Sequence, residues 1–209
     1  MTERNLYLFG YSGHALVVKD CLNGLYHLKG YFAPEKNSTN PLQLHYEGYE
    51  DQMDLNSYRD KGSFFPAIGN NKIRKHLHQL MMLNQLQEIH AIHNRSIVSE
   101  TALIGLSTMI GPACIVNAGA EIGSAVILNS GSIIEHECRI ANYVHVAPGA
   151  ILAGKVSVGE GSFIGAGAVI REGVKIGVNC VIGAGAVVLN NVPDNELWAG
   201  VPAQSKKKL

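Results

Sequence analysis

The second half of the chain places an aliphatic residue at every sixth position. From Val98 to Val188, sixteen successive positions all hold Val, Ile or Leu, and the phase never breaks. The residue four places after each is small or β-branched. A period of six matches neither the 3.6-residue repeat of a helix nor the two-residue alternation of a strand alone. It predicts a parallel β-helix, with aliphatic side chains inside and small residues at its inner corners. A β-sandwich with chance periodicity would not hold this phase.

This repeat resembles the hexapeptide-repeat, left-handed parallel β-helix of bacterial acyltransferases. The resemblance implies three hexads, or 18 residues, per coil. It also implies a left-handed winding, unlike the usual right-handed crossover between parallel strands.

Residues 1–90 show a different hydrophobic pattern, in which short apolar runs alternate with amphipathic segments. The expected elements are strands at 5–9, 28–34 and 63–69, helices at 14–25 and 70–86, and a last strand at 87–93 that leads into the repeat. This order predicts a small Rossmann-like α/β unit with three layers and parallel strands. We therefore expect an α/β domain at 1–90 and a β-helix domain at 91–209 that ends in a C-terminal extension.

Composition narrows the function classes. Hydrophobic residues make up 46% of the chain, charged residues 16%, and the formal net charge is zero. A globular protein is expected, and nucleic acid is disfavoured as a partner because phosphate neutralisation needs a basic surplus. The sequence shows neither a signal-peptide core nor an apolar run long enough to span a membrane. The four cysteines lack CxxC spacing, which favours reduced thiols and a cytoplasmic location.

Three of these cysteines, Cys114, Cys138 and Cys180, fall at the small, inward position of their hexads. A thiol in that place is expected to fill the core, with a raised pKa. An acyl-cysteine intermediate is therefore disfavoured.

Two turns between a strand and a helix could bind phosphate. The first is "GYSGH" at 10–14 and the second is "AIGNN" at 67–71. Backbone N–H groups at a helix N-terminus can hold an anion, yet a plain two-glycine turn and a plain Asn cap explain the same residues. The lysines at 206–208 could likewise be a solvated tail or could contact nucleotide phosphates.

His136 and His145 are the only histidines inside the hexads, and Glu135 and Glu137 flank the first of them. A neighbouring carboxylate can orient an imidazole and raise its basicity. Residues one coil away from His136 are Ala118 and Gly154, which leave room for a ligand. No metal is expected, because two histidines nine residues apart fall short of a zinc site, and a γ-carbonic-anhydrase-like protein would need a third.

The motifs "FGYSGHA", "AIGNNKIRK", "IEHE" and "AGVPA" together are distinctive. They resemble the sugar O-/N-acyltransferases related to sialic acid O-acetyltransferase and, more closely, the UDP-4-amino-sugar N-acetyltransferases of bacillosamine biosynthesis. The resemblance implies that the α/β domain binds a UDP-sugar and that the β-helix binds acetyl-CoA. It also implies a homotrimer with active sites between subunits.

The same resemblance implies a role for each matching residue. His136 would be the general base and Glu137 would enhance its basicity. Acetyl-CoA would be contacted by His145, near the thioester, and by the backbone around Gly154, Ala166 and Ala184. The nucleotide sugar would be held by Ser12, Gly13, His14 and Gly69. The sequence departs from the family at one place. The family can carry an acidic pair that contacts uridine after the second strand, but this chain has Ala33 and Pro34 there, so the identity of the nucleotide stays open.

The predicted function is direct transfer of an acetyl group from acetyl-CoA to the 4-amino group of a nucleotide-linked sugar, UDP being the first nucleotide to test. Two alternatives stay open. One is an O-acetyltransferase acting on a sialic-acid-type sugar, and the other is a non-catalytic solenoid that binds nucleotide sugars. The sequence names neither the sugar nor its pathway.

Overall fold

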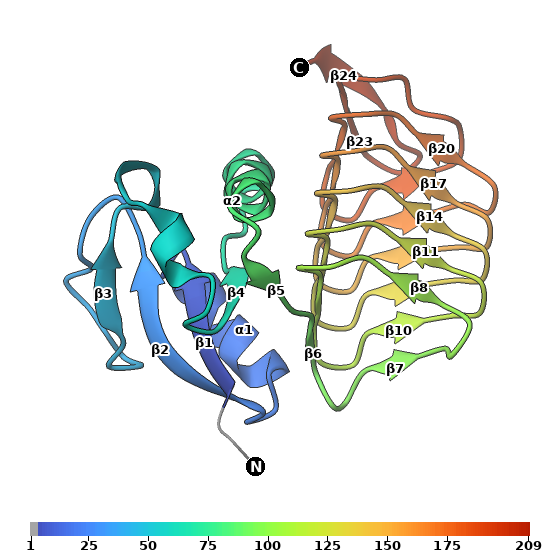
Figure 1. Ribbon diagram of the computed structural model, residues 1–209. Helices are drawn as coiled ribbons and strands as arrows, with labels where there is room; N and C mark the ends of the chain where they lie inside the picture. Colours follow the sequence, from blue (N-terminus) through green and yellow to red (C-terminus); the bar gives the residue numbers. More distant parts are fainter. Residues whose placement is uncertain (1–3) are drawn as a thin grey trace.

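The computed structural model describes residues 4–209, so the first three residues of the expected 1–90 domain lie outside the described residues. An α/β domain stands beside a column of stacked coils (Figure 1). The elements of the domain are β1 (Arg4–Phe9), α1 (Gly13–Cys21), β2 (Tyr26–Phe32), β3 (His45–Gly48), two 3₁₀ turns η1 (Glu50–Gln52) and η2 (Leu55–Tyr58), β4 (Ser63–Pro66), α2 (Asn71–Leu83) and β5 (Gln87–Glu88). All five strands are parallel, in the order β3-β2-β1-β4-β5.

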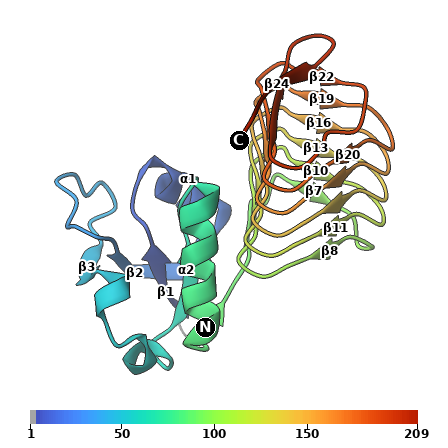
Figure 2. The same cartoon turned by 90° about the horizontal axis from the view of Figure 1, so that it is seen from above.

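Helices cover both faces of this sheet, as the sequence predicts. Ala15, Val18 and Cys21 of α1 pack on one face. Leu77 and Met81 of α2 pack with η2 on the other face. α2 lies along the side of the domain that faces the coils (Figure 2). The sequence analysis missed the strand β3, whereas β5 lies within the last strand expected, at 87–93.

The second half forms a parallel β-helix. Its two-residue strands are β6 (Ala91–Ile92), β7 (Ile97–Val98), β8 (Leu103–Ile104), β9 (Met109–Ile110), β10 (Ile115–Val116), β11 (Glu121–Ile122), β12 (Ile127–Leu128), β13 (Ile133–Ile134), β14 (Arg139–Ile140), β15 (His145–Val146), β16 (Ile151–Leu152), β17 (Ser157–Val158), β18 (Phe163–Ile164), β19 (Val169–Ile170), β20 (Lys175–Ile176), β21 (Val181–Ile182) and β22 (Val187–Val188). Ile115 pairs with Ile133, and Ile133 with Ile151. Partners are thus 18 residues apart, which confirms three hexads per coil.

The coils build three sheets. We name one by the domain that it contacts and the other two by the character of their outward side chains. The domain-side sheet contains β6, β9, β12, β15, β18 and β21 and lies against the α/β domain. The aliphatic sheet contains β7, β10, β13, β16, β19 and β22, and the polar sheet contains β8, β11, β14, β17 and β20. A corner of four residues joins each strand to the next.

The interior holds the aliphatic residue of each hexad and the small corner residue. Cys114, Cys138 and Cys180 are fully buried there, as predicted. Burial raises the pKa of all three thiols, that of Cys138 to about 11. These thiols are core residues, because a buried and protonated sulfur is a poor nucleophile.

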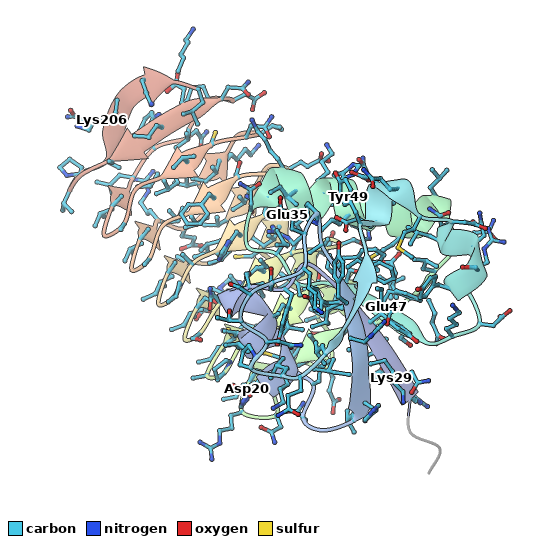
Figure 3. All side chains as sticks on the ribbon, turned by 90° about the vertical axis from the view of Figure 1, so that its left-hand side faces the viewer. Asp20, Lys29, Glu35, Glu47, Tyr49 and Lys206 are labelled. Carbon is cyan, nitrogen blue, oxygen red and sulfur yellow. The ribbon has the colours of Figure 1, made fainter. Side chains whose placement is uncertain are left out.

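Two further strands close the column. β23 (Glu196–Ala199) continues the domain-side sheet in parallel, and β24 (Gln204–Lys208) pairs with it in the antiparallel direction. Lys206 lies on this last strand, at the end of the column away from the labelled side chains of the α/β domain (Figure 3). Within residues 4–209, no helix has the length and apolar character needed to cross a membrane.

Candidate active site

His136 sits on the corner between β13 and β14, at the edge where the aliphatic and polar sheets meet. Its side chain is 51% exposed, and its Nδ1 lies 3.2 Å from Glu137 Oε2. Glu135 contacts only the backbone N–H of His136, at 3.4 Å. Glu137 is therefore the carboxylate that orients the ring. With Nδ1–H donated to a carboxylate, Nε2 is left as the basic atom.

The imidazole of His136 lies over Gly154, one coil further along. The His136 carbonyl accepts the N–H of Lys155 at 2.9 Å, so the two corners are stacked. A Cβ on Gly154 would come within 2.6 Å of His136 Nε2. The equivalent positions in other coils carry Ala118 and Glu172, so the corner itself accepts side chains. The absence of a Cβ at Gly154 leaves space for the His136 imidazole, as the 18-residue spacing predicts.

His145 is partly buried on β15, in the domain-side sheet. Its Nδ1 lies 3.3 Å from the Gly69 carbonyl, and Asn129 Nδ2 lies 3.4 Å from Nε2. The Phe163 ring packs edge-on against it, with centroids 5.0 Å apart. Burial, and next the charge of Arg74, lower the pKa of His145 to about 4. This imidazole is neutral near pH 7.

The predicted nucleotide-sugar residues do not share one cavity. Ser12 and Gly13 line a small cavity of about 130 Å³ beside Tyr11 and Asn37. The Ser12 side chain makes no capping hydrogen bond, and the first turn of α1 has no acidic residue. The first N–H groups of that helix therefore remain available to an anion.

His14 instead turns toward the β-helix. Its ring centroid lies 6.5 Å from that of His145, and its Nε2 is buried without a partner in the described chain. Burial, reinforced by the charge of Arg74, lowers the pKa of His14 to about 4. His14, His145 and Gly69 thus form one neutral, half-enclosed group where the two domains meet.

Gly69 also borders a cavity of about 680 Å³ between the start of α2 and the domain-side sheet. Lys72, Lys75 and Phe163 line it as well. Lys75 forms an ion pair with Glu160 at 2.6 Å, and Asn71 donates to the Gly161 carbonyl at 2.9 Å. The sequence analysis missed this cavity, since residues 90 positions apart create it.

Arg74 is the second feature that sequence reasoning missed. It is 1% exposed and lies at the junction of α2 with the coils. A signal was present, because Arg74 shares the buried face of α2 with Leu77, His78 and Met81. A charged residue on an apolar helix face calls for a reason.

The predicted coenzyme residues occupy two different edges of the column. Ala166 and Ala184 lie one coil apart on the edge between the domain-side and aliphatic sheets, where the Gly185 N–H donates to the Ala166 carbonyl at 2.8 Å. Gly154 lies with His136 on the edge between the aliphatic and polar sheets. Within one chain, the whole aliphatic sheet separates them.

A parallel α/β domain followed by a parallel β-helix of hexads, with a histidine–glutamate pair on one edge, is the architecture of a hexapeptide-repeat acyltransferase. Residues 5–81 match the PglD N-terminal domain family, and residues 155–190 match the bacterial transferase hexapeptide (six repeats) family.

Solved structures agree along the whole chain. The acetyltransferase domain of PglB from Neisseria gonorrhoeae FA1090, in complex with acetyl coenzyme A, is 29% identical with a TM-score of 0.89, covering 98% of this chain and 100% of that one. A histidine variant of perosamine N-acetyltransferase from Caulobacter crescentus, in complex with CoA and GDP-perosamine, is 32% identical with a TM-score of 0.90, covering 98% and 97%. WeeI from Acinetobacter baumannii AYE, 24% identical with a TM-score of 0.84 and covering 96% and 99%, shares the fold.

The chain belongs to the family of PglD-type hexapeptide-repeat sugar N-acetyltransferases. The resemblance read from the motifs, and the fold it implied, are confirmed.

Proposed function

We propose that this protein transfers an acetyl group from acetyl-CoA to the 4-amino group of a nucleotide-linked deoxy sugar, with His136 as general base. One observation carries the proposal. Glu137 holds Nδ1 of His136, while Nε2 stands free over the bare backbone of Gly154. This arrangement suits general base catalysis, because Glu137 fixes the ring and no described residue hydrogen-bonds to Nε2.

The reaction balances without a covalent enzyme intermediate. The sugar amine, having released its ammonium proton to water, attacks the thioester carbonyl, and His136 Nε2 takes a second proton from the nitrogen as the C–N bond forms. The C–S bond then breaks, and the departing CoA sulfur receives the proton that His136 carries. Such base catalysis contributes about 10²–10⁴-fold to the rate.

The aliphatic sheet supports the predicted homotrimer. Its outward side chains form an unbroken row of Ile97, Ile115, Ile133, Ile151, Val169 and Val187. Packing of three such faces about a three-fold axis would bury the row. It would also set the His136 edge of one copy beside the Ala166 edge of the next, uniting the two halves of the predicted coenzyme site.

The sugar nucleotide would bind at the carboxyl end of the domain sheet. The free N–H groups at the start of α1, beside Ser12 and Gly13, suit a diphosphate. His14 and Gly69 lie between that point and His145, on the path a sugar would follow to the donor. The perosamine N-acetyltransferase structure contains GDP-perosamine, and the bacillosamine-type resemblance suggests UDP. UDP-, dTDP- and GDP-4-amino sugars therefore all belong in the assay.

The decisive variant is His136→Ala. We expect kcat to fall by about 10² or more, because the amine would lose its proton acceptor. Mass spectrometry of the acetylated sugar measures the reaction, with a hydroxyl-only sugar as the test for O-acetylation. His76→Ala is the matched control, since His76 is an exposed histidine that pairs with Asp51. Near-normal turnover of His136→Ala, with unchanged oligomer mass, would refute the assignment. A lack of thermal stabilisation by acetyl-CoA would favour a non-catalytic protein.

A further inference from the structure

Arg74 is a buried cation whose N–H groups donate to neutral carbonyl and amide oxygens rather than to a carboxylate. Its five N–H groups all find acceptors, namely oxygens of Ala125, Ile68, Gly69, Asn71 and Tyr143 at 2.7, 3.2, 3.0, 2.8 and 2.9 Å. Four of these oxygens are main-chain carbonyls. Across the described residues, no carboxylate forms an ion pair with it. A buried charge is costly, so a fold that keeps one without a counterion needs a compensating reason.

The acceptors tie two parts of the molecule together. The carbonyls of Ile68 and Gly69 belong to the loop between β4 and α2, whereas those of Ala125 and Tyr143 come from stacked corners of successive coils. Arg74 therefore fixes the Gly69 loop against the β-helix. A lysine could reach only some of these oxygens, because its ammonium group lacks the planar fork of a guanidinium.

The Gly69 carbonyl then fixes the proton on His145. This carbonyl can only accept, so His145 Nδ1, 3.3 Å away, must be the donor. Asn129 Oδ1 already accepts the N–H of Ser130 at 2.8 Å, which leaves Asn129 Nδ2 to donate to His145 Nε2. Both contacts require a neutral ring with its proton on Nδ1. Nε2 is consequently an acceptor.

We propose that Arg74 is a positioning residue for acetyl transfer, which holds the Gly69 carbonyl in place and keeps His145 neutral, so that an amide N–H from the pantetheine arm of acetyl-CoA can replace the 3.4 Å contact of Asn129 and donate to Nε2. The proposal rests on the proposed function, in which His145 lies beside the thioester. It also implies that His145 does not stabilise the oxyanion, since Nε2 carries no proton. The charged and titratable groups that act on His145 are Arg74 and His14, and both oppose its protonation.

Nuclear magnetic resonance of ¹⁵N-histidine-labelled full-length protein tests the tautomer directly, with His145→Asn to assign the signal. We expect the ring nitrogens of His145 to report a proton on Nδ1 and no titration from pH 8.5 to pH 5.5. A proton on Nε2, or a charged ring at pH 6, would overturn the proposal. This result does not depend on any activity, so it stands apart from the outcome for His136→Ala.

Two variants separate charge from position. Arg74→Gln removes the charge, so the pKa of His145 should rise, while burial still holds it below the ordinary value of about 6.5. The ratio of its kcat/KM for acetyl-CoA to that of the wild type should then be lower at pH 5.5 than at pH 8, because a larger fraction of the His145 rings would be protonated at pH 5.5. Arg74→Lys keeps the charge but lacks the planar fork that fixes the Gly69 carbonyl. Its KM for acetyl-CoA should therefore rise by the same factor at every pH.

Arg59→Gln, which removes an exposed arginine of the same domain, is the control and should match the wild type. A purely structural role for Arg74 would lower the activity of Arg74→Gln equally at each pH, and that outcome would refute the electrostatic part. If Arg74→Gln does not fold, the tautomers of His145 in the wild type and in Arg74→Lys decide the question.

Discussion

The aliphatic and polar sheets have the same parallel backbone arrangement and differ in their outward side chains. Along the aliphatic sheet every outward residue is Ile or Val, from Ile97 to Val187. Along the polar sheet the outward residues are Leu103, Glu121, Arg139, Ser157 and Lys175. Inward, both sheets present the same aliphatic hexad residue. The repeat thus specifies the fold through its interior, while the outer positions are free to specify what each face meets.

The outer positions indicate two different environments. A row of ladder-paired β-branched side chains favours burial against another surface, whereas mixed charges such as the Glu121–Arg139 pair, 3.7 Å apart, favour water. The third sheet shows the covered case, since its Met109 and Ile127 are buried beneath the α/β domain. His136 lies where the apolar and charged faces meet, which would be the edge of the proposed contact between copies.

The strongest test of this contrast is a charge on each face. Ile115→Glu should abolish trimer formation and reduce kcat/KM by more than about 10², because a carboxylate buried without a partner costs several kcal/mol. Ser157→Glu on the polar sheet is the matched control and should leave both unchanged, since Arg139 and Lys175 flank it. Analytical ultracentrifugation measures the mass. An Ile115→Glu protein of wild-type mass and activity would contradict the assignment of this face.

A smaller effect is expected on the edge that joins the two faces. Gly154→Ala should lower kcat by about 10- to 100-fold, since the new methyl group would displace the His136 imidazole and small misplacements cost that much. Glu172→Ala, at the same corner position one coil on, is the control. Steady-state kinetics with both substrates distinguishes a fall in kcat from a rise in KM. Unchanged kcat in Gly154→Ala would show that the ring does not need this gap.

The smallest effect concerns the domain-side sheet, where neutral histidines are enclosed. The pKa of His14 is lowered to about 4 in the folded chain and returns to about 6.5 on unfolding. The unfolded chain therefore binds the proton more readily, and the free energy of unfolding falls as pH drops from about 6.5 to about 4. The loss is about 2 kcal/mol at pH 5.

Thermal unfolding at pH 7.5 and pH 5 checks this expectation. The change in melting temperature between the two pH values should shrink in His14→Asn. It should persist in His27→Asn, which alters an exposed histidine on β2. Equal pH dependence in the two variants would mean that His14 does not contribute.

Much of the fold could be predicted because the hexad signal comes from the interior and repeats sixteen times. The strand that was missed, β3, carries no such signal. It lies at the sheet edge and has no buried residue, so the sequence around His45 shows no apolar pattern. The pairing of His136 with Glu137 follows from local sequence, yet only coordinates distinguish Glu137 from Glu135.

The contacts across the domain junction could not be predicted from the sequence, for a different reason. His145 meets Gly69, 76 positions away, and Arg74 meets Ala125, 51 positions away. Periodicity describes one element at a time and says nothing about which distant loop will lie against it. The roles assigned to Ser12, Gly13 and the two alanines of the coenzyme edge remain predictions for the same reason, since their partners would be ligands or other copies.

The antiparallel turn of β24 has a consequence for the length of the column. A stack of parallel coils has open edges that could accept another coil, and unchecked growth of that kind produces filaments. The last strand reverses direction and carries Lys206, Lys207 and Lys208, all exposed. A second column approaching end to end would meet a reversed hydrogen-bonding edge and three like charges. We therefore expect β24 to disfavour end-to-end stacking at the last strand of the domain-side sheet.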